Sequence, residues 1–186
     1  VIGDGGTTGS QRRSAAFTWA KNATHLIGVC APSLYSQRAR IAPTAAVTAF
    51  TPLMTISGSG CLFANLQFFH GFDTGTTAQI ALSITGSRNV FKNVHVAGMG
   101  DAASAQDAGS RCIKIATGGE NLFEDCVIGI DTVTRSAANA NVEFASGTTR
   151  NTFRRCHFPI YTDDATATAY VGSAAACMDR SQVFED

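Results

Sequence analysis

The chain has 186 residues, of which 45% are hydrophobic, enough for one domain with a sizeable core. Charged residues make up only 15%, and 14 Lys and Arg balance 14 Asp and Glu, which excludes nucleic-acid binding through bulk charge. The most apolar window, residues 45–56, is short and is interrupted by Thr and Pro52, which excludes a membrane-spanning helix.

The N-terminal part differs in composition from the rest of the chain. Residues 1–25 are Gly-rich at the start and predict an extended lead-in. Short strands are expected around 26–29 and 39–42, as an irregular first turn of a domain covering 26–186. The chain starts with Val1 and stops inside a repeated phrase, so we expect this domain to continue beyond residue 186.

A phrase built around one phenylalanine recurs along the chain, as in "RNVFKNVHV", "ENLFEDCVI" and "RNTFRRCHF". Successive copies of this phenylalanine are 28, 32, 30 and 31 residues apart. A near-constant period of this size predicts stacked structural units. The residues concerned are Phe63, Phe91, Phe123, Phe153 and Phe184.

Each unit contains three short strand patterns and no helical one. Alternating runs precede the phenylalanine at 53–56, 80–84, 112–115 and 141–144, and a turn containing Gly follows each run. Alternation continues after the phenylalanine. The sequence therefore predicts an all-β, right-handed parallel β-helix, a solenoid with about 28–32 residues and three short strands per turn.

Equivalent positions of the units form coherent columns. The phenylalanines are predicted to stack in the core, while the residues at +1 and −3 alternate in charge, as stacked neighbours should. Asparagines recur at −2, where they can bond along the column and tolerate the backbone angles of a corner. The residues at −1 form an apolar outward stripe, a candidate subunit interface. This stripe is Leu62, Val90, Leu122, Thr152 and Val183.

Six cysteines are present, and none forms a CxxC pair. Cys126 and Cys156 share an inward position and are interpreted as small core residues, poorly placed for a disulfide bond. His95 and His157 fall in one outward column with Gln67 and Val127, and we interpret these histidines as surface residues. No metal ion or other cofactor is predicted.

Carboxylates on the long loops are the candidates for catalysis. The adjacent pair Asp163 and Asp164 follows the fourth copy of the phrase, and Asp131 stands near the start of the corresponding loop one unit earlier. Hydrolysis of a polysaccharide uses two such groups. Aspartate is also common in turns, and we favour that interpretation, so no catalytic residue is assigned.

The pattern "G-S-x-N-x-F-x-N-x-x-[FIV]" resembles the single-stranded right-handed β-helix, or pectin-lyase-like, superfamily over about residues 26–186. "LIGVCAPS" and "ISGSGCLFANLQF" look most like β-helices of bacteriophage tailspikes and capsid-decorating spikes. "TDD" and "RCIK" stand in the wrong order for the polygalacturonase branch, and Gly-His-Gly does not occur in the sequence.

This resemblance implies a bacteriophage virion structural protein, a rigid scaffold or host-facing surface. A homotrimer, contacts with other virion proteins and a host surface glycan are the implied partners, and assembly would take place in the bacterial cytoplasm. A polysaccharide-degrading tailspike lyase or hydrolase is the first alternative, and a bacterial surface adhesin is the second.

Overall fold

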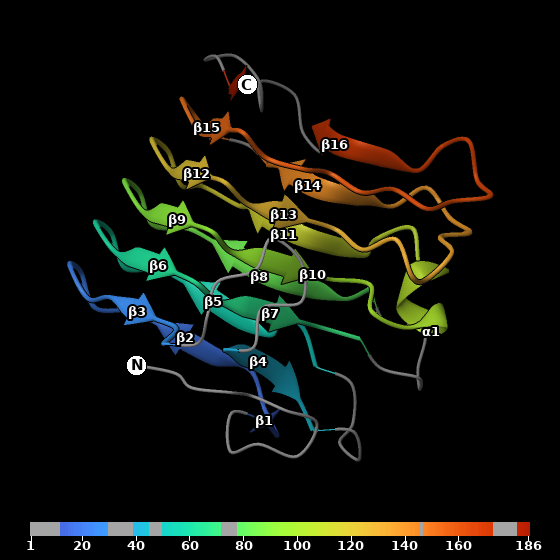
Figure 1. The fold of residues 1–186 in the computed structure, drawn as a ribbon, viewed down its shortest axis with the longest axis horizontal. Helices are drawn as coiled ribbons and strands as arrows, with labels where there is room; N and C mark the ends of the chain where they lie inside the picture. The colour runs from blue at the N-terminus through green and yellow to red at the C-terminus, as the bar shows by residue number, and fades with distance from the viewer. Residues whose placement is uncertain (1–11, 30–38, 45–49, 72–77, 146, 173–181) are drawn as a thin grey trace.

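The computed structural model describes residues 12–29, 39–44, 50–71, 78–145, 147–172 and 182–186. Seventeen strands in these residues form three sheets in which every neighbouring pair is parallel. The chain makes about five turns with three strands per turn, and successive turns stack from blue to red in Figure 1. The predicted parallel β-helix is therefore confirmed.

Each of the three sheets collects one strand from successive turns. The first sheet has the order β1 (Arg12–Arg13), β4 (Arg40–Pro43), β7 (Gln67–Phe69), β10 (His95–Ala97) and β13 (Val127–Ile128). The second has the order β16 (Thr168–Gly172), β14 (Ala140–Phe144), β11 (Arg111–Ile115), β8 (Ile80–Ile84), β5 (Met54–Ile56) and β2 (Phe17–Trp19). The third has the order β17 (Val183–Glu185), β15 (Thr152–Arg154), β12 (Leu122–Glu124), β9 (Val90–Lys92), β6 (Leu62–Ala64) and β3 (Leu26–Ile27).

The start of the coil lies earlier than the expected boundary at residue 26. Strands β1 and β2 fall within the segment predicted as a lead-in, yet they pair with β4 and β5. A single short helix, α1 (Ala102–Ala105), occurs in the described residues, on a loop between β10 and β11. None of the described helices is long and apolar enough to cross a membrane.

The five repeated phenylalanines form one column of stacked rings along the coil. Successive ring centroids are 4.9, 4.5, 4.6 and 5.1 Å apart, close to the spacing of parallel strands. The first four rings are buried. Phe184 is 41% exposed, contrary to the expected burial, because β17 is the last strand of its sheet. The four buried rings belong to the hydrophobic core.

The asparagine column bonds along the coil, but it does not adopt the corner conformation itself. Asn89, Asn121 and Asn151 are buried, and the side-chain oxygen of each accepts the backbone N–H of the residue one turn earlier. The left-handed backbone belongs instead to the preceding residues, with φ of 58° at Arg88 and Glu120. The amides therefore satisfy corner N–H groups that would otherwise be buried without a partner.

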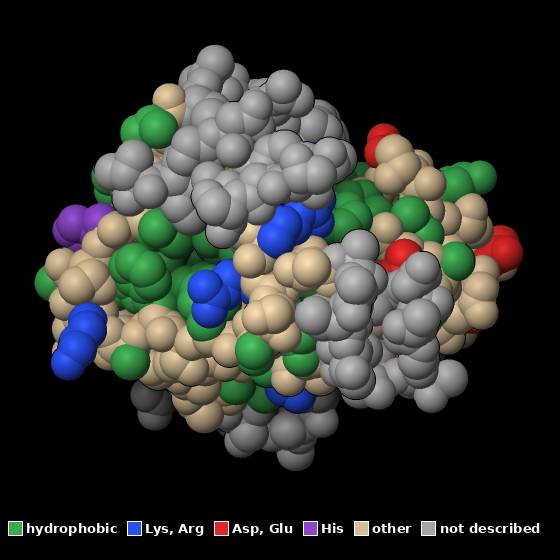
Figure 2. Space-filling model, turned by 90° about the horizontal axis from the view of Figure 1, so that it is seen from below, with side chains coloured by type: hydrophobic (Ala, Val, Ile, Leu, Met, Phe, Trp, Pro, Cys, Tyr) green, Lys and Arg blue, Asp and Glu red, His purple; other side chains and the backbone are tan. Residues whose placement is uncertain are grey.

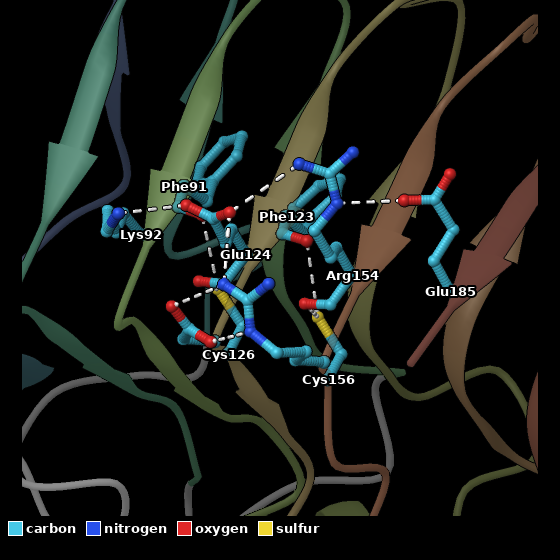
Figure 3. Close-up of polar contacts among 10 residues, drawn as sticks. Phe91, Lys92, Phe123, Glu124, Cys126, Arg154, Cys156 and Glu185 are labelled. Atoms are coloured by element: carbon cyan, nitrogen blue, oxygen red, sulfur yellow. Dashed lines mark hydrogen bonds and ion pairs between the residues drawn. The ribbon is translucent and has the colours of Figure 1, made fainter.

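The predicted alternation of charge appears as two ladders of ion pairs, one at the corner that precedes the third sheet and one on the outer face of that sheet. Arg88 and Arg150 both contact Glu120, at 2.7 and 2.5 Å. In the second ladder Lys92 lies 2.9 Å from Glu124, and Arg154 lies 2.8 Å from Glu185 (Figure 3). The cations of these pairs are exposed, and the Glu120 and Glu124 side chains are partly exposed, so each pair contributes little to stability, but the pairs favour one register between turns.

The apolar stripe lies between these two ladders, on the outer face of the same sheet. Its five members, Leu62, Val90, Leu122, Thr152 and Val183, are paired in register and partly exposed. Alternation along each strand accounts for this, because the phenylalanine next to each of them points inward. The role of the stripe as a subunit interface stays a prediction.

Replacement of Leu122 by Asp tests that prediction. If the stripe packs against other copies of the chain, a charge in its middle would be buried without a partner and would dissociate the assembly. Light scattering should then report a lower mass for Leu122→Asp, while circular dichroism shows an intact β fold. A folded variant with the mass of the wild type would show that the stripe is not the interface.

Candidate functional site

A pocket with opposite charges at its wall lies on the outer face of the first sheet. It has a volume of about 450 Å³ and receives side chains from β4, β7, β10 and the loop after β13. Its lining residues are Arg40, Gln67, Phe69, His95, Ala97, Ile130, Asp131 and Thr132. We call this the Arg40–Asp131 pocket.

Strand alternation explains why these side chains face outward together. Ile41, Phe68 and Val96 are buried in the core, so their neighbours point to the opposite face of the sheet. Arg40 pairs with Gln67, and Gln67 pairs with His95, on three successive turns. The stacking of turns therefore brings together residues that are 27 or 28 positions apart in the sequence.

A chain of hydrogen bonds joins these three side chains. Arg40 Nε donates to Gln67 Oε1, and Gln67 Nε2 lies 2.9 Å from His95 Nδ1. His95 Nε2 lies 3.0 Å from the carbonyl oxygen of Gly129. The carbonyl can only accept, so Nε2 carries the proton and Nδ1 accepts from the amide. This arrangement assigns one tautomer to neutral His95.

The surface position predicted for His95 is wrong, because only 4% of this residue is exposed. The loop after β13 supplies Gly129, which bonds the ring, and Ile130 to Thr132, which complete the wall of the pocket. Burial lowers the pKa of His95, and the neighbouring Arg40 lowers it further, against opposing effects of the Gly129 carbonyl and Asp131. A neutral His95 with both nitrogens bonded orients Gln67 and, through it, Arg40.

The three candidate carboxylates lie in different settings. Asp131 is exposed and lines the pocket. Asp163 and Asp164 lie on the loop between β15 and β16 and do not line it. Asp164 Oδ1 accepts from Thr166 N and Oγ1, at 2.7 and 2.5 Å, which lowers the pKa of Asp164. This bonding of Asp164 is that of a turn residue.

Sequence reasoning missed Arg40 and Phe69 as members of a site. The Arg40 guanidinium lies over the Phe69 ring, 5.6 Å from its centroid, which fixes the cation against an aromatic face. The sequence did contain a signal for Arg40. The outward column of Gln67, His95 and Val127 has Arg40 as its equivalent residue on the preceding turn. The irregular spacing of the first turn hid that register.

Comparison with known proteins gives a distant likeness. No family model and no curated protein matches the chain. Among solved structures, the pectin methylesterase from Aspergillus niger in deglycosylated form matches over 90% of this chain and 78% of its own, with a TM-score of 0.41 and 14% sequence identity. At this distance the likeness assigns no activity to the chain.

The chemistry of the Arg40–Asp131 pocket is that of a binding site for a polar molecule. Arg40 offers a fixed fork of donors, and Asp131 offers two acceptor oxygens. Phe69, Ala97 and Ile130 add apolar surface to the wall of the pocket. No group of three or more His, Cys, Asp or Glu in the described residues could hold a metal ion.

A second hollow lies at the end of the coil that carries β1, β2 and β3. Figure 2 shows hydrophobic side chains gathered on this end with Lys and Arg among them. The hollow has a volume of about 480 Å³ and includes Trp19, Lys21 and His25 in its wall. Its strands are the first in their sheets, so part of this apolar surface is the end of the core itself.

Proposed function

We propose that the chain forms a rigid, host-facing β-helix of a bacteriophage particle, which binds a saccharide in the Arg40–Asp131 pocket. The single observation that carries the binding role is the placement of a cation, a carboxylate and an aromatic ring around one pocket. The virion setting rests on the resemblance of the sequence to bacteriophage β-helices.

A saccharide suits the pocket because it combines hydroxyl groups with an apolar face of C–H groups. Arg40 would donate to ring or hydroxyl oxygens, and Asp131 would accept from neighbouring hydroxyls. Phe69 and Ile130 would contact the C–H face. Because Arg40 is held by Gln67 and by the Phe69 ring, little side-chain freedom would be lost on binding.

The carboxylate and the histidine of the pocket favour binding of a saccharide over its cleavage. Glycoside hydrolysis uses two carboxyl groups on either side of the scissile bond, and among the described residues that line this pocket Asp131 is the one carboxylate. His95 has both ring nitrogens engaged and a lowered pKa, so it is poorly suited to take up a proton from a substrate. The proposed role is therefore recognition on a stiff support.

Two variants of the pocket test the proposal on an array of bacterial surface oligosaccharides. We expect Asp131→Asn and Arg40→Lys each to weaken binding of the selected glycan about tenfold or more, since the first loses a charged acceptor and the second loses the planar fork of donors that Gln67 holds in place. Asp163→Asn is the matched control, because Asp163 is an exposed aspartate that does not line the pocket. Equal binding by all four proteins would contradict the proposal.

The same assay separates the first alternative from the proposal. Release of shorter oligosaccharides by the wild type, abolished in Asp131→Asn, would identify a polysaccharide-degrading enzyme instead.

The proposed place of the protein in a bacteriophage particle is tested separately by mass spectrometry of purified virions. Detection at a fixed copy number supports the proposed virion protein, whereas detection only in bacterial envelopes supports the adhesin.

A further inference from the structure

The hydrogen bonds that join Arg40, Gln67 and His95 have a fixed direction, because each end of this network has only one possible role. The Arg40 guanidinium can only donate, so the oxygen of the Gln67 amide faces Arg40 and its nitrogen faces His95. At the other end the Gly129 carbonyl can only accept, so His95 Nε2 carries the proton and Nδ1 accepts from Gln67. Donors and acceptors of the network are matched only while His95 is neutral.

A further proton on His95 would break this match. It would lie on Nδ1, 2.9 Å from Gln67 Nε2, so that two donors face one another. If the Gln67 amide turned over, its oxygen would face His95, but its N–H groups would then face Arg40 Nε, which is also a donor. The amide has one oxygen, and two cations would compete for it. With the ring in place, a charged His95 is therefore incompatible with the bond between Arg40 and Gln67.

The surroundings of His95 allow it to take up this proton only in acidic solution. Burial is the largest effect on the pKa of His95 and lowers it below the ordinary value of about 6.5. Of the nearby charges, Arg40 on β4 opposes a positive ring and Asp131 on the loop after β13 favours one. Strands β7, β13 and β8 have no titratable side chain, and the two basic residues of β11 are paired with Glu143. His95 lines the pocket, through which water can deliver a proton.

We propose that His95 makes the Arg40–Asp131 pocket a pH-sensitive binding site, which holds its ligand while the ring is neutral and releases it when the ring is charged. Protonation of His95 withdraws the Gln67 oxygen from Arg40, and the guanidinium loses the contact that aligns its donors in the pocket. The Phe69 ring keeps the cation nearby but does not fix its donors. The network belongs to the chain alone, whereas its effect on a ligand rests on the proposed saccharide site.

Nuclear magnetic resonance of the free protein tests the network without a ligand. At neutral pH we expect the Nε2–H tautomer of His95 and an Arg40 Nε–H that is protected from exchange with solvent. On acidification this protection should be lost with the same midpoint as the titration of the His95 ring. The opposite tautomer, a ring that stays neutral until the protein unfolds, or protection that persists after the ring is charged would each overturn the proposal.

Two variants separate competition for the amide from a general effect of charge. Gln67→Glu supplies one oxygen for Arg40 and a second for a charged His95, so the protection of Arg40 Nε–H should persist through the titration of the ring. His95→Asn has no titrating ring, and its side-chain oxygen can accept from Gln67, so the protection should not change over the same range. Loss of protection with an unchanged midpoint in either variant would contradict the proposal, and thermal unfolding checks that each is folded.

His157→Asn is the matched control, because it makes the same substitution at an exposed histidine that does not line the pocket. Its exchange profile should be that of the wild type. A profile that loses its pH dependence in this variant would assign the effect to the wrong histidine.

Calorimetry with the glycan selected on the array measures the effect on binding. The affinity of the wild type should be constant near neutral pH and then fall by up to about tenfold per pH unit below the pKa of His95, because only the neutral fraction binds well. In Gln67→Glu the affinity should not fall with the titration of His95. A wild-type affinity that stays constant while His95 titrates would overturn the pH-sensitive site and leave the saccharide site standing. Absence of glycan binding at every pH would instead contradict the proposed function, and the exchange data would still decide whether the network responds to pH.

Discussion

Replacement of Phe123 by alanine is expected to lower the free energy of unfolding by about 3–5 kcal/mol. Phe123 is buried, and its ring stacks on Phe91 at 4.5 Å and on Phe153 at 4.6 Å. The substitution removes contacts on both ring faces and leaves a cavity that neighbouring turns cannot close without breaking their strand pairing.

Phe184→Ala is the matched control, since this ring belongs to the same column but is 41% exposed. Less of its apolar surface is withheld from water, so the loss of stability should be clearly smaller than for Phe123→Ala. Urea unfolding of the two variants, followed by circular dichroism, gives the comparison. Equal losses would show that the stack contributes no more at its centre than at its end.

The repeated phrase predicted the fold because each feature of the coil is carried by one position in it. Phenylalanine occupies the inward position, and its neighbours at Leu122 and Glu124 point outward by strand alternation. One register relation therefore fixes the core column, the ion-pair ladders and the asparagine column together. A shift of one residue in the pairing of a strand would have turned its phenylalanine to the outer face.

The site could not be predicted in the same way, because it depends on a loop and on the irregular first turn. Whether an outward side chain such as His95 is exposed depends on what covers it. The sequence from Gly129 to Thr132 has no pattern that predicts that this loop lies against His95. Among the candidate aspartates, Asp131 lines the pocket because it lies on that loop. Sequence position alone did not distinguish it from Asp163.

His70 predicts how the stability of the protein depends on pH. This residue follows β7, is completely buried, and has its ring centroid 5.8 Å from that of Phe50. Burial lowers the pKa of His70 to about 4, and a hydrogen bond with the Phe50 backbone opposes the shift. The folded protein therefore keeps His70 neutral at pH values where the unfolded chain takes up a proton.

The sign of the effect follows from proton binding. Well above a pH of about 6.5 neither state is protonated at this residue, so the full stability is present. As the pH falls from about 6.5 to about 4, the unfolded chain binds the proton first, and stability should decrease by on the order of 3 kcal/mol. His95, whose pKa is also lowered by burial, acts in the same direction.

His70→Gln removes this titration while it keeps a polar amide next to Phe50. Its stability at pH 7 is expected to be lower, but its loss between pH 6.5 and 4 should be shallower by a similar amount. The pKa values of Glu120, Glu124 and Asp125 are lowered by their Arg and Lys neighbours, so the ion pairs begin to lose their contribution as the pH falls through the unfolded pKa of a carboxyl group, about 4, at the acidic end of this range. Added salt screens those exposed pairs and should leave the His70 difference intact. Urea unfolding of both proteins across this range gives the measurement, and parallel profiles would contradict the assignment to His70.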